Sequence, residues 1–212
     1  NDNSLLLFQI WLNLPSSSKM VEPNFTMFWK EEIPVVKHVD DEGKYIRIEV
    51  IAGEYGGITS PSPPPDSWAA DTESHVAIWL VELDEGATWN LPAHAAGLSR
   101  MLYFYAGDSI TAAGQNIQVS HGLRLKSGEA LTIKAIGQSA SLLLLQGKPI
   151  AEPVAHHGPF VMNTREELQQ AFTDYQRDHF GGWPWKRNDQ VHGKRGRFAR
   201  YADGKEEEPT QP

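Results

Sequence analysis

The pattern of apolar and polar residues predicts a chain that is built mainly from short β-strands. It is clearest over residues 74–83, where apolar and β-branched side chains lead into the turn formers Asp84 and Gly86. Further strands are expected at residues 5–14, 45–52, 87–91, 99–106, 116–119, 129–136 and 141–146. Several short strands separated by turns are typical of an all-β sandwich or barrel.

One segment follows a helical pattern instead. Thr164 is a suitable N-cap, and Glu167 three residues later completes a capping box. The apolar residues that follow fall on one face of a helix, at Leu168, Ala171, Phe172 and Tyr175. Gly181 and Gly182 are expected to end it. No helical pattern of similar length occurs elsewhere, so we expect this helix to pack on the outside of the barrel.

The chain divides into a central core with extensions on both sides. A proline- and serine-rich loop at residues 59–68 cannot pair in a sheet. Three consecutive glutamates and the terminal prolines indicate a disordered end. We therefore expect a strand and linker at 1–44, a barrel at 45–150, a loop and helix at 151–182, and an irregular tail at 183–212.

Composition narrows the environment and the partners. The 212 residues carry a formal net charge of −8, which argues against nucleic-acid binding over the whole surface. Cysteine is absent, so disulfides and thiolate metal sites are excluded, and a reducing compartment fits. The longest apolar run, residues 5–10, is too short to span a membrane, and no basic stretch precedes it. The sequence predicts a cytoplasmic protein without a membrane role.

Spaced polar residues follow the strand at 74–83. After Gly86 come Pro92 at the sixth position and His94 at the eighth. This spacing resembles the first metal-binding motif of cupin barrels, in which a glycine precedes two histidines and then a glutamate. Pro92 occupies the first histidine position, and the glutamate position falls at Arg100, or at Ser99 with a shift of one residue. The resemblance implies a cupin-type barrel in which His94 is the remnant of a ligand set.

The second cupin motif is also degenerate, because Leu131 stands where that motif has its histidine. We therefore expect no metal in this barrel, since one protein ligand does not hold an ion in a dedicated site. His94 is then an ordinary polar residue near the barrel mouth. Trp89, Met101 and Tyr103 are expected to fill the space of a metal pocket, and a large open cavity would contradict this packing hypothesis.

Two other groups of residues invite a functional interpretation. His156 and His157 could form a metal pair, but neighbouring residues on an extended chain point to opposite faces. The tail mixes basic residues (Lys186, Arg187, Lys194, Arg195, Arg197 and Arg200) with aromatic ones (Trp183, Trp185 and Phe198). Such a mixture can bind single-stranded nucleic acid. We favour the alternative, that the tail folds back on an acidic surface, and expect no nucleic-acid partner.

Seven segments of the sequence resemble the pirin family. They are residues 8–15, 19–23, 51–54, 144–150, 152–164, 180–185 and 196–200. Pirins are bicupins, so the resemblance implies a C-terminal cupin barrel preceded by remains of a first barrel over residues 1–44. The family's iron lies in the N-terminal barrel, on three histidines and a glutamate upstream of residues 8–14. The resemblance thus implies that the iron site, together with most of that barrel, is missing from this chain.

Two functions remain open. Family members are reported as quercetin dioxygenases and as redox-responsive transcriptional co-regulators. We favour a non-catalytic binding or regulatory module, and the alternative is the C-terminal region of a pirin-type metal oxygenase. No catalytic residue can be assigned from the sequence. The apolar segment from Leu5 to Leu14 is expected to pair with another chain, as in self-association, or to lie on the remaining barrel.

Overall fold

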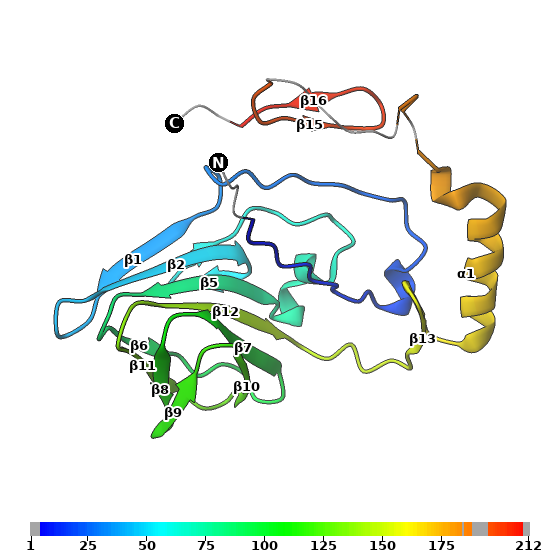
Figure 1. The fold of residues 1–212 in the computed structure, drawn as a ribbon. Helices are drawn as coiled ribbons and strands as arrows, with labels where there is room; N and C mark the ends of the chain where they lie inside the picture. Colours follow the sequence, from blue (N-terminus) through cyan, green and yellow to red (C-terminus); the bar gives the residue numbers. More distant parts are fainter. Residues whose placement is uncertain (1–4, 184, 188–194, 210–212) are drawn as a thin grey trace.

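The computed structural model describes residues 5–183, 185–187 and 195–209, and its centre is a barrel of two antiparallel sheets (Figure 1). The larger sheet contains, in spatial order, β1 (Val35–Val39), β2 (Tyr45–Ala52), β5 (Ala77–Leu83), β12 (Ala140–Gly147), β7 (Ser99–Ala106) and β10 (His121–Lys126). The smaller sheet contains β6 (Thr88–Leu91), β11 (Leu131–Ile136), β8 (Ser109–Ala112) and β9 (Gln115–Gln118). This architecture confirms the predicted all-β cupin barrel.

Alternation of side chains along the strands builds the core between the two sheets. In β2, Ile46, Ile48 and Val50 are buried, whereas the residues between them are partly exposed. Leu102 and Phe104 of β7 meet them from the same sheet. Each such side chain contributes about 1.5–3 kcal/mol on full burial. The period of two in the sequence is therefore the direct cause of this one-sided core.

Most of the predicted strands are confirmed. Residues 45–52 and 99–106 form β2 and β7 over the expected ranges, and β5, β6, β9, β11 and β12 lie within three residues of the expected positions. The short strand β8 and the strand β10 were not predicted. Both begin directly after tight turns, so their few residues lack a long alternating pattern.

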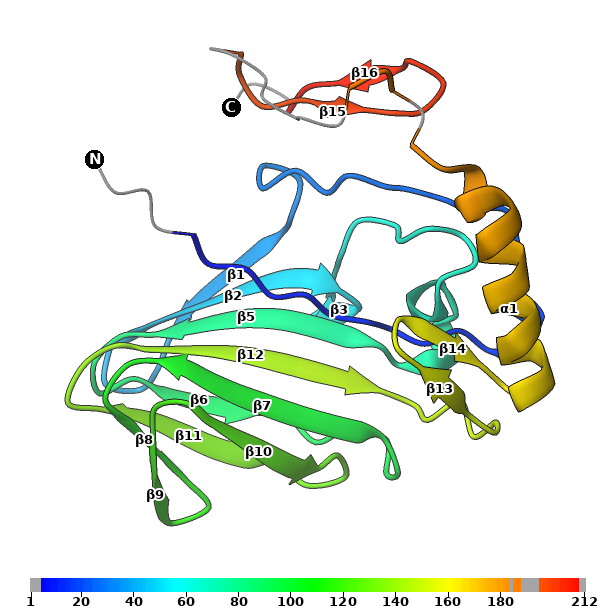
Figure 2. The ribbon, with the colours of Figure 1, turned by 45° about the vertical axis from the view of Figure 1, so that its right-hand side comes forward.

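The strand predicted at residues 5–14 is wrong. This segment is extended but pairs with no strand of the described chain, and it crosses the outer face of the larger sheet (Figure 2). The ring of Phe8 lies edge-on to that of Tyr105, with 4.9 Å between centroids. Leu5, Leu7 and Trp11 remain largely exposed. Apolar content was therefore a poor guide here, because a strand also needs a neighbour that offers free backbone groups.

The predicted helix is present as α1 (Arg165–Asp178), and its capping box is formed by Thr164 and Glu167. It ends earlier than expected, with His179 as the left-handed C-cap. Its position differs from the prediction. It packs on the hairpin of β13 (Ala155–His157) and β14 (Phe160–Met162), beside the barrel and not on it (Figure 1). The ring of Phe160 anchors this contact, 4.5 Å from that of Phe172.

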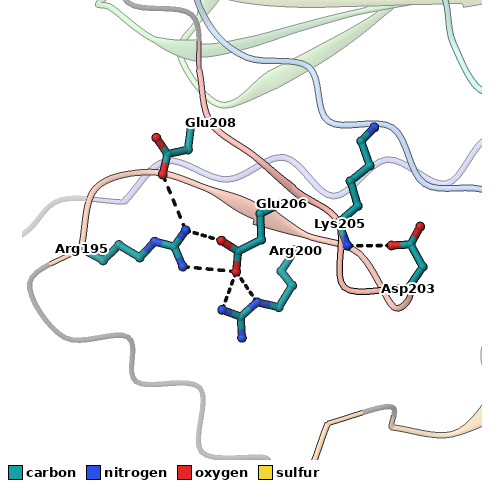
Figure 3. A network of polar contacts seen from close by, with 6 residues as sticks. All are labelled: Arg195, Arg200, Asp203, Lys205, Glu206 and Glu208. Atoms are coloured by element: carbon teal, nitrogen blue, oxygen red, sulfur yellow. Dashed lines mark hydrogen bonds and ion pairs between the residues drawn. The ribbon is translucent and has the colours of Figure 1, made fainter.

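The C-terminal region is more ordered than the sequence suggested. In place of a disordered end, β15 (Ala199–Arg200) and β16 (Glu206–Glu207) form a hairpin. Glu206 accepts hydrogen bonds from Arg195 and Arg200 within it (Figure 3). The expected irregular tail is thus contradicted at this hairpin, and residues 184, 188–194 and 210–212 lie outside the described structure. Among the helices described, none is both long enough and apolar enough to cross a membrane.

Candidate functional site

A pocket of about 780 Å³ opens at one end of the barrel. Its rim consists of the loop at residues 59–65, the hairpin of β3 (Glu54–Tyr55) and β4 (Ile58–Thr59), and the short helices η2 (Trp68–Ala70) and η3 (Thr72–Ser74). Its inner wall is formed by residues of the barrel, chiefly Trp79 of β5, Gln146 of β12 and the turn that carries His94. The volume is that of a typical small-molecule site.

Two histidines meet in this pocket. The rings of His75 and His94 lie 4.9 Å apart, with an interplanar angle of 62°. Nδ1 of His94 accepts a hydrogen bond from the backbone N–H of Ala95 at 2.7 Å. The neutral ring therefore carries its proton on Nε2, which has no partner among the described residues. Partial burial, the nearby His75 and the positive charge of Arg100 all lower the pKa of His94, which favours this neutral form.

Arg100 does not line the pocket but lies buried directly behind its inner wall, with 2 % of its surface exposed. Its Nε donates to Oε1 of Gln146 at 2.7 Å, and its Nη1 donates to the carbonyl of Pro92 at 2.9 Å. Gln146 and Arg100 are direct partners in the register of β12 and β7. Burial lowers the pKa of Arg100. Burying a charged group without an opposite charge is costly, so this residue calls for an explanation.

The network continues to an unusual backbone position. Nε2 of Gln146 donates to the carbonyl of His75 at 3.1 Å. His75 has a φ of 51°, in the left-handed region that residues with a side chain seldom adopt. It adopts this conformation as the C-cap of η3, where its backbone N–H donates to the carbonyl of Thr72. Gln146 therefore fixes both the Arg100 guanidinium and the segment that carries His75.

Aromatic residues form the apolar wall of the pocket. The Tyr55 ring lies 5.0 Å from that of Trp79, in an edge-on arrangement. The Tyr55 hydroxyl accepts a hydrogen bond from Nε1 of Trp89 at 3.1 Å. By contrast, Nε1 of Trp79 is buried and has no hydrogen-bond partner in the described structure. An unpaired buried donor is rare in folded proteins.

The residues at this barrel mouth do not fit a metal ion. Within the described part of the chain, no group of three or more histidine, cysteine, aspartate or glutamate side chains is placed to hold one. His94 and His75 offer two imidazoles. However, Arg100 places a positive charge at the position where the cupin motif has its glutamate. A cation would be repelled there, so we derive no metal-dependent step for this site.

The packing hypothesis for the barrel interior is right for one residue and wrong for two. Trp89 is fully buried in the core. Met101 and Tyr103 instead point to the outer face of β7, because Arg100, Leu102 and Phe104 take the inward positions. The inner wall of the pocket of about 780 Å³ includes the core residues Ala77 and Trp79, so the expected filled interior is contradicted at this end of the barrel.

The two remaining candidate groups are placed away from the pocket. His156 and His157 lie side by side on β13, and the ring of His157 packs edge-on to Phe172 of α1, at 5.5 Å. No third ligand of the described chain joins them. His157 is therefore accounted for by packing of α1 on its hairpin, whereas His156 is exposed.

In the tail, Arg195, Arg197 and Arg200 form ion pairs within the chain. Arg197 contacts Glu31 at 2.6 Å, and Arg195 lies 3.7 Å above the ring of Phe198. Trp183 and Trp185 pack edge-on to each other, with centroids 4.8 Å apart. Lys194 lies outside the described residues. The contact with Glu31 agrees with a tail that folds back on an acidic segment.

Comparison with solved structures shows which fold class this protein belongs to. The structure aligns with a crystal structure of quercetin 2,3-dioxygenase from Acinetobacter baumannii, with a TM-score of 0.65 and 28 % identity, over 81 % of this chain and 55 % of that one. The fold is that of the cupins.

The family is indicated by sequence. Residues 78–181 match the pirin C-terminal cupin domain. The chain is 34 % identical over 172 residues to human pirin, covering 79 % of this chain and 54 % of pirin. It is 38 % identical over 175 residues to a Vibrio cholerae protein whose name assigns it provisionally to the quercetin 2,3-dioxygenases. The alignment covers 82 % of this chain and 58 % of that protein. These findings support placing the chain in the pirin family. The chain spans somewhat more than half the length of these relatives.

Arg100 and His75 are the site residues that sequence reasoning did not single out. Arg100 was noted only as a poor metal ligand. Its inward direction could have been read from the alternation with Leu102 and Phe104, since one face of β7 is otherwise apolar.

Proposed function

We propose that this chain is a pirin-like cupin module that binds a small molecule or serves a regulatory role, and that it catalyses no reaction through a metal of its own. The buried guanidinium of Arg100 carries this proposal. It opposes a cation beside His94, whereas the adjoining pocket has room for an organic ligand. We also place the module in the cytoplasm, as the absence of cysteine suggests.

A metal-loading experiment tests the proposal. The chain is incubated with Fe(II) or Ni(II), freed of unbound ion, and assayed for bound metal and for flavonol oxidation. We expect much less than one ion per chain and no turnover. A matched His94→Ala variant shows whether any residual metal depends on the barrel mouth. Stoichiometric metal together with turnover would overturn the proposal.

A second proposal is that the chain is the C-terminal region of a metal-dependent oxygenase of the quercetin 2,3-dioxygenase kind. The similarity to the Acinetobacter baumannii enzyme supports it. The iron site would then lie in the part of such relatives that the chain does not cover. The intact mass of the source protein and its flavonol oxidation after iron loading decide this point. A longer, iron-loaded source protein without turnover would count against it.

Residues 5–14 provide a proposed contact for a partner chain. Leu5 is 86 % exposed and Leu7 is 73 % exposed, although both are apolar. The same segment leaves a partly open pocket against Tyr103, Tyr105 and Leu143 of the larger sheet. Contiguous exposed apolar residues are characteristic of association surfaces. We propose self-association through this segment, which the sedimentation experiment in the Discussion tests.

A further inference from the structure

We propose that the pocket at the barrel mouth binds a small organic carboxylate with an aromatic or apolar body, and that Arg100 balances its charge. The inference rests on the proposed binding function and names its ligand class. It is carried by an unbalanced charge behind the pocket wall, by an unpaired donor of His94 and by the apolar rim of the pocket.

The unbalanced charge is that of Arg100. No carboxylate in the described part of the chain forms an ion pair with it. Its two hydrogen bonds go to neutral oxygens, those of Gln146 and Pro92. Its third nitrogen, Nη2, has no partner among the described residues. The guanidinium does not itself line the pocket, but both residues that accept its hydrogen bonds do, so its uncompensated charge acts on the inner end of the pocket across a single layer of residues. A carboxylate at that end would compensate the charge.

Two further donors on pocket-lining side chains have no partner in the described structure. Nε2 of His94 carries a proton and has no partner in the described structure, because Nδ1 accepts from Ala95. Nε1 of Trp79 is a buried donor without an acceptor. Gln146 has both of its side-chain groups occupied. Nε1 of Trp79 is fully buried, so Nε2 of His94 is the donor that an oxygen of a ligand could reach.

The rim of the pocket determines which chemical groups the other end of the ligand can carry. Tyr55 and Trp79 present aromatic surface, and the prolines of the 59–65 loop add an apolar border. Two exposed carboxylates, Glu54 and Asp71, also lie on this rim. They disfavour a second negative charge near the opening. A monocarboxylate whose acid group faces inward and whose apolar body faces the rim fits both constraints.

Benzoate is the probe, and benzamide is its neutral counterpart of the same shape. Both are titrated into the full chain by isothermal titration calorimetry at neutral pH and low salt. We expect benzoate to bind at least tenfold more tightly than benzamide. In Arg100→Gln this preference should disappear. Arg124→Gln is the matched control and should keep the preference. Arg124 is exposed on β10 and, unlike Arg100, has no hydrogen bond to a pocket-lining residue in the described structure.

The outcome remains decisive if Arg100→Gln fails to fold. His94→Ala changes an exposed position and is expected to weaken benzoate severalfold while leaving benzamide unchanged. Equal affinity of the unmodified chain for benzoate and benzamide would overturn the inference, as would full benzoate binding by folded Arg100→Gln. Failure of the proposed function is a separate result, since it is detected as bound metal with flavonol turnover.

Discussion

The carboxylate of Glu152 accepts hydrogen bonds from the backbone N–H and the hydroxyl of Ser16, at 2.7 and 3.1 Å, although 136 residues separate them. The same carboxylate accepts a hydrogen bond from Nδ2 of Asn163 at 2.8 Å, just before the start of α1. These hydrogen bonds lower the pKa of Glu152, and the bond from the Ser16 backbone has the largest effect. One side chain thus fastens the N-terminal segment to the beginning of the helix.

Replacing Glu152 should release that segment. In Glu152→Ala we expect trypsin to cut faster after Lys19, which lies next to the turn at Ser16–Ser18, because the backbone around it loses its anchor. Mass spectrometry of the fragments measures the rate. Glu166→Ala is the control, since Glu166 is an exposed residue of the same region and makes no contact with Ser16. An unchanged rate in Glu152→Ala would contradict the anchoring role.

Substitutions at neighbouring residues on the inward and outward faces of β7 should lower the free energy of unfolding by different amounts. Leu102→Ala removes a fully buried side chain and should lower the free energy of unfolding by about 2–5 kcal/mol. Met101→Ala, one residue away on the outer face, should have a clearly smaller effect. Urea denaturation of both variants measures the difference. Equal losses would show that the two faces have been assigned wrongly.

The C-terminal hairpin should open in acid. Hydrogen bonds from Arg195 and Arg200 lower the pKa of Glu206 to about 2, from an ordinary value of 4.5. Glu206 therefore binds a proton more readily in the open hairpin than in the closed one. Its stabilisation of the closed hairpin is complete above the ordinary pKa and is lost as the pH falls towards about 2. Amide exchange of Ala199 and Glu207 follows the opening. Glu206→Gln should open the hairpin at neutral pH, and constant protection down to acid pH would argue against the ion pairs.

The charge of Arg100 should be measurable at His94. Partial burial, His75 and Arg100 lower the pKa of His94. Because the pKa is lowered in the folded chain, His94 binds a proton more readily in the unfolded chain. The contribution of neutral His94 to folding stability is therefore present above the ordinary pKa of about 6.5 and declines as the pH falls below it.

Arg100→Gln should therefore raise the pKa of His94, as followed by the imidazole resonances in a pH titration. The rim carboxylates of Glu54 and Asp71 and the ring of His75 are unchanged in this variant, so they do not confuse the comparison. If the pKa stays where it was, the guanidinium is too well screened to act on the pocket.

Self-association is expected to depend on the N-terminal segment. In sedimentation velocity, the sedimentation coefficient of the unmodified chain should increase with protein concentration. That of a Leu6→Asp, Leu7→Asp double variant should stay constant, because charges oppose burial of this surface. Ile136→Asp is the control, since Ile136 is also exposed and apolar but lies on β11 of the smaller sheet. A clean monomer at every concentration would reject the proposed contact.

Local patterns were sufficient for most of the barrel and for the helix start. The alternation in β2 and the capping box of α1 each depend on residues within a few positions, so the sequence displays them directly. Residues 5–14 show where this reasoning fails. Whether an apolar segment becomes a strand depends on an available sheet edge, and no local pattern reports that.

The site was less predictable because its contacts join distant parts of the chain. Arg100 and Gln146 meet through strand register, and His75 joins them through a backbone carbonyl 71 residues from Gln146. The cupin spacing located His94 and showed that the metal-ligand pattern is lost. It gave no reason to expect a buried cation in its place, since that follows only from which face of β7 turns inward.

The central place of β12 in the larger sheet has a consequence for biosynthesis. This strand pairs with β5 on one side and with β7 on the other. Both neighbours leave the ribosome before it does, so their facing edges stay open until residues 140–147 have been translated. Pairings between segments far apart in sequence also form slowly. The nascent chain therefore passes through a stage with two apolar open edges, when chaperone protection matters most.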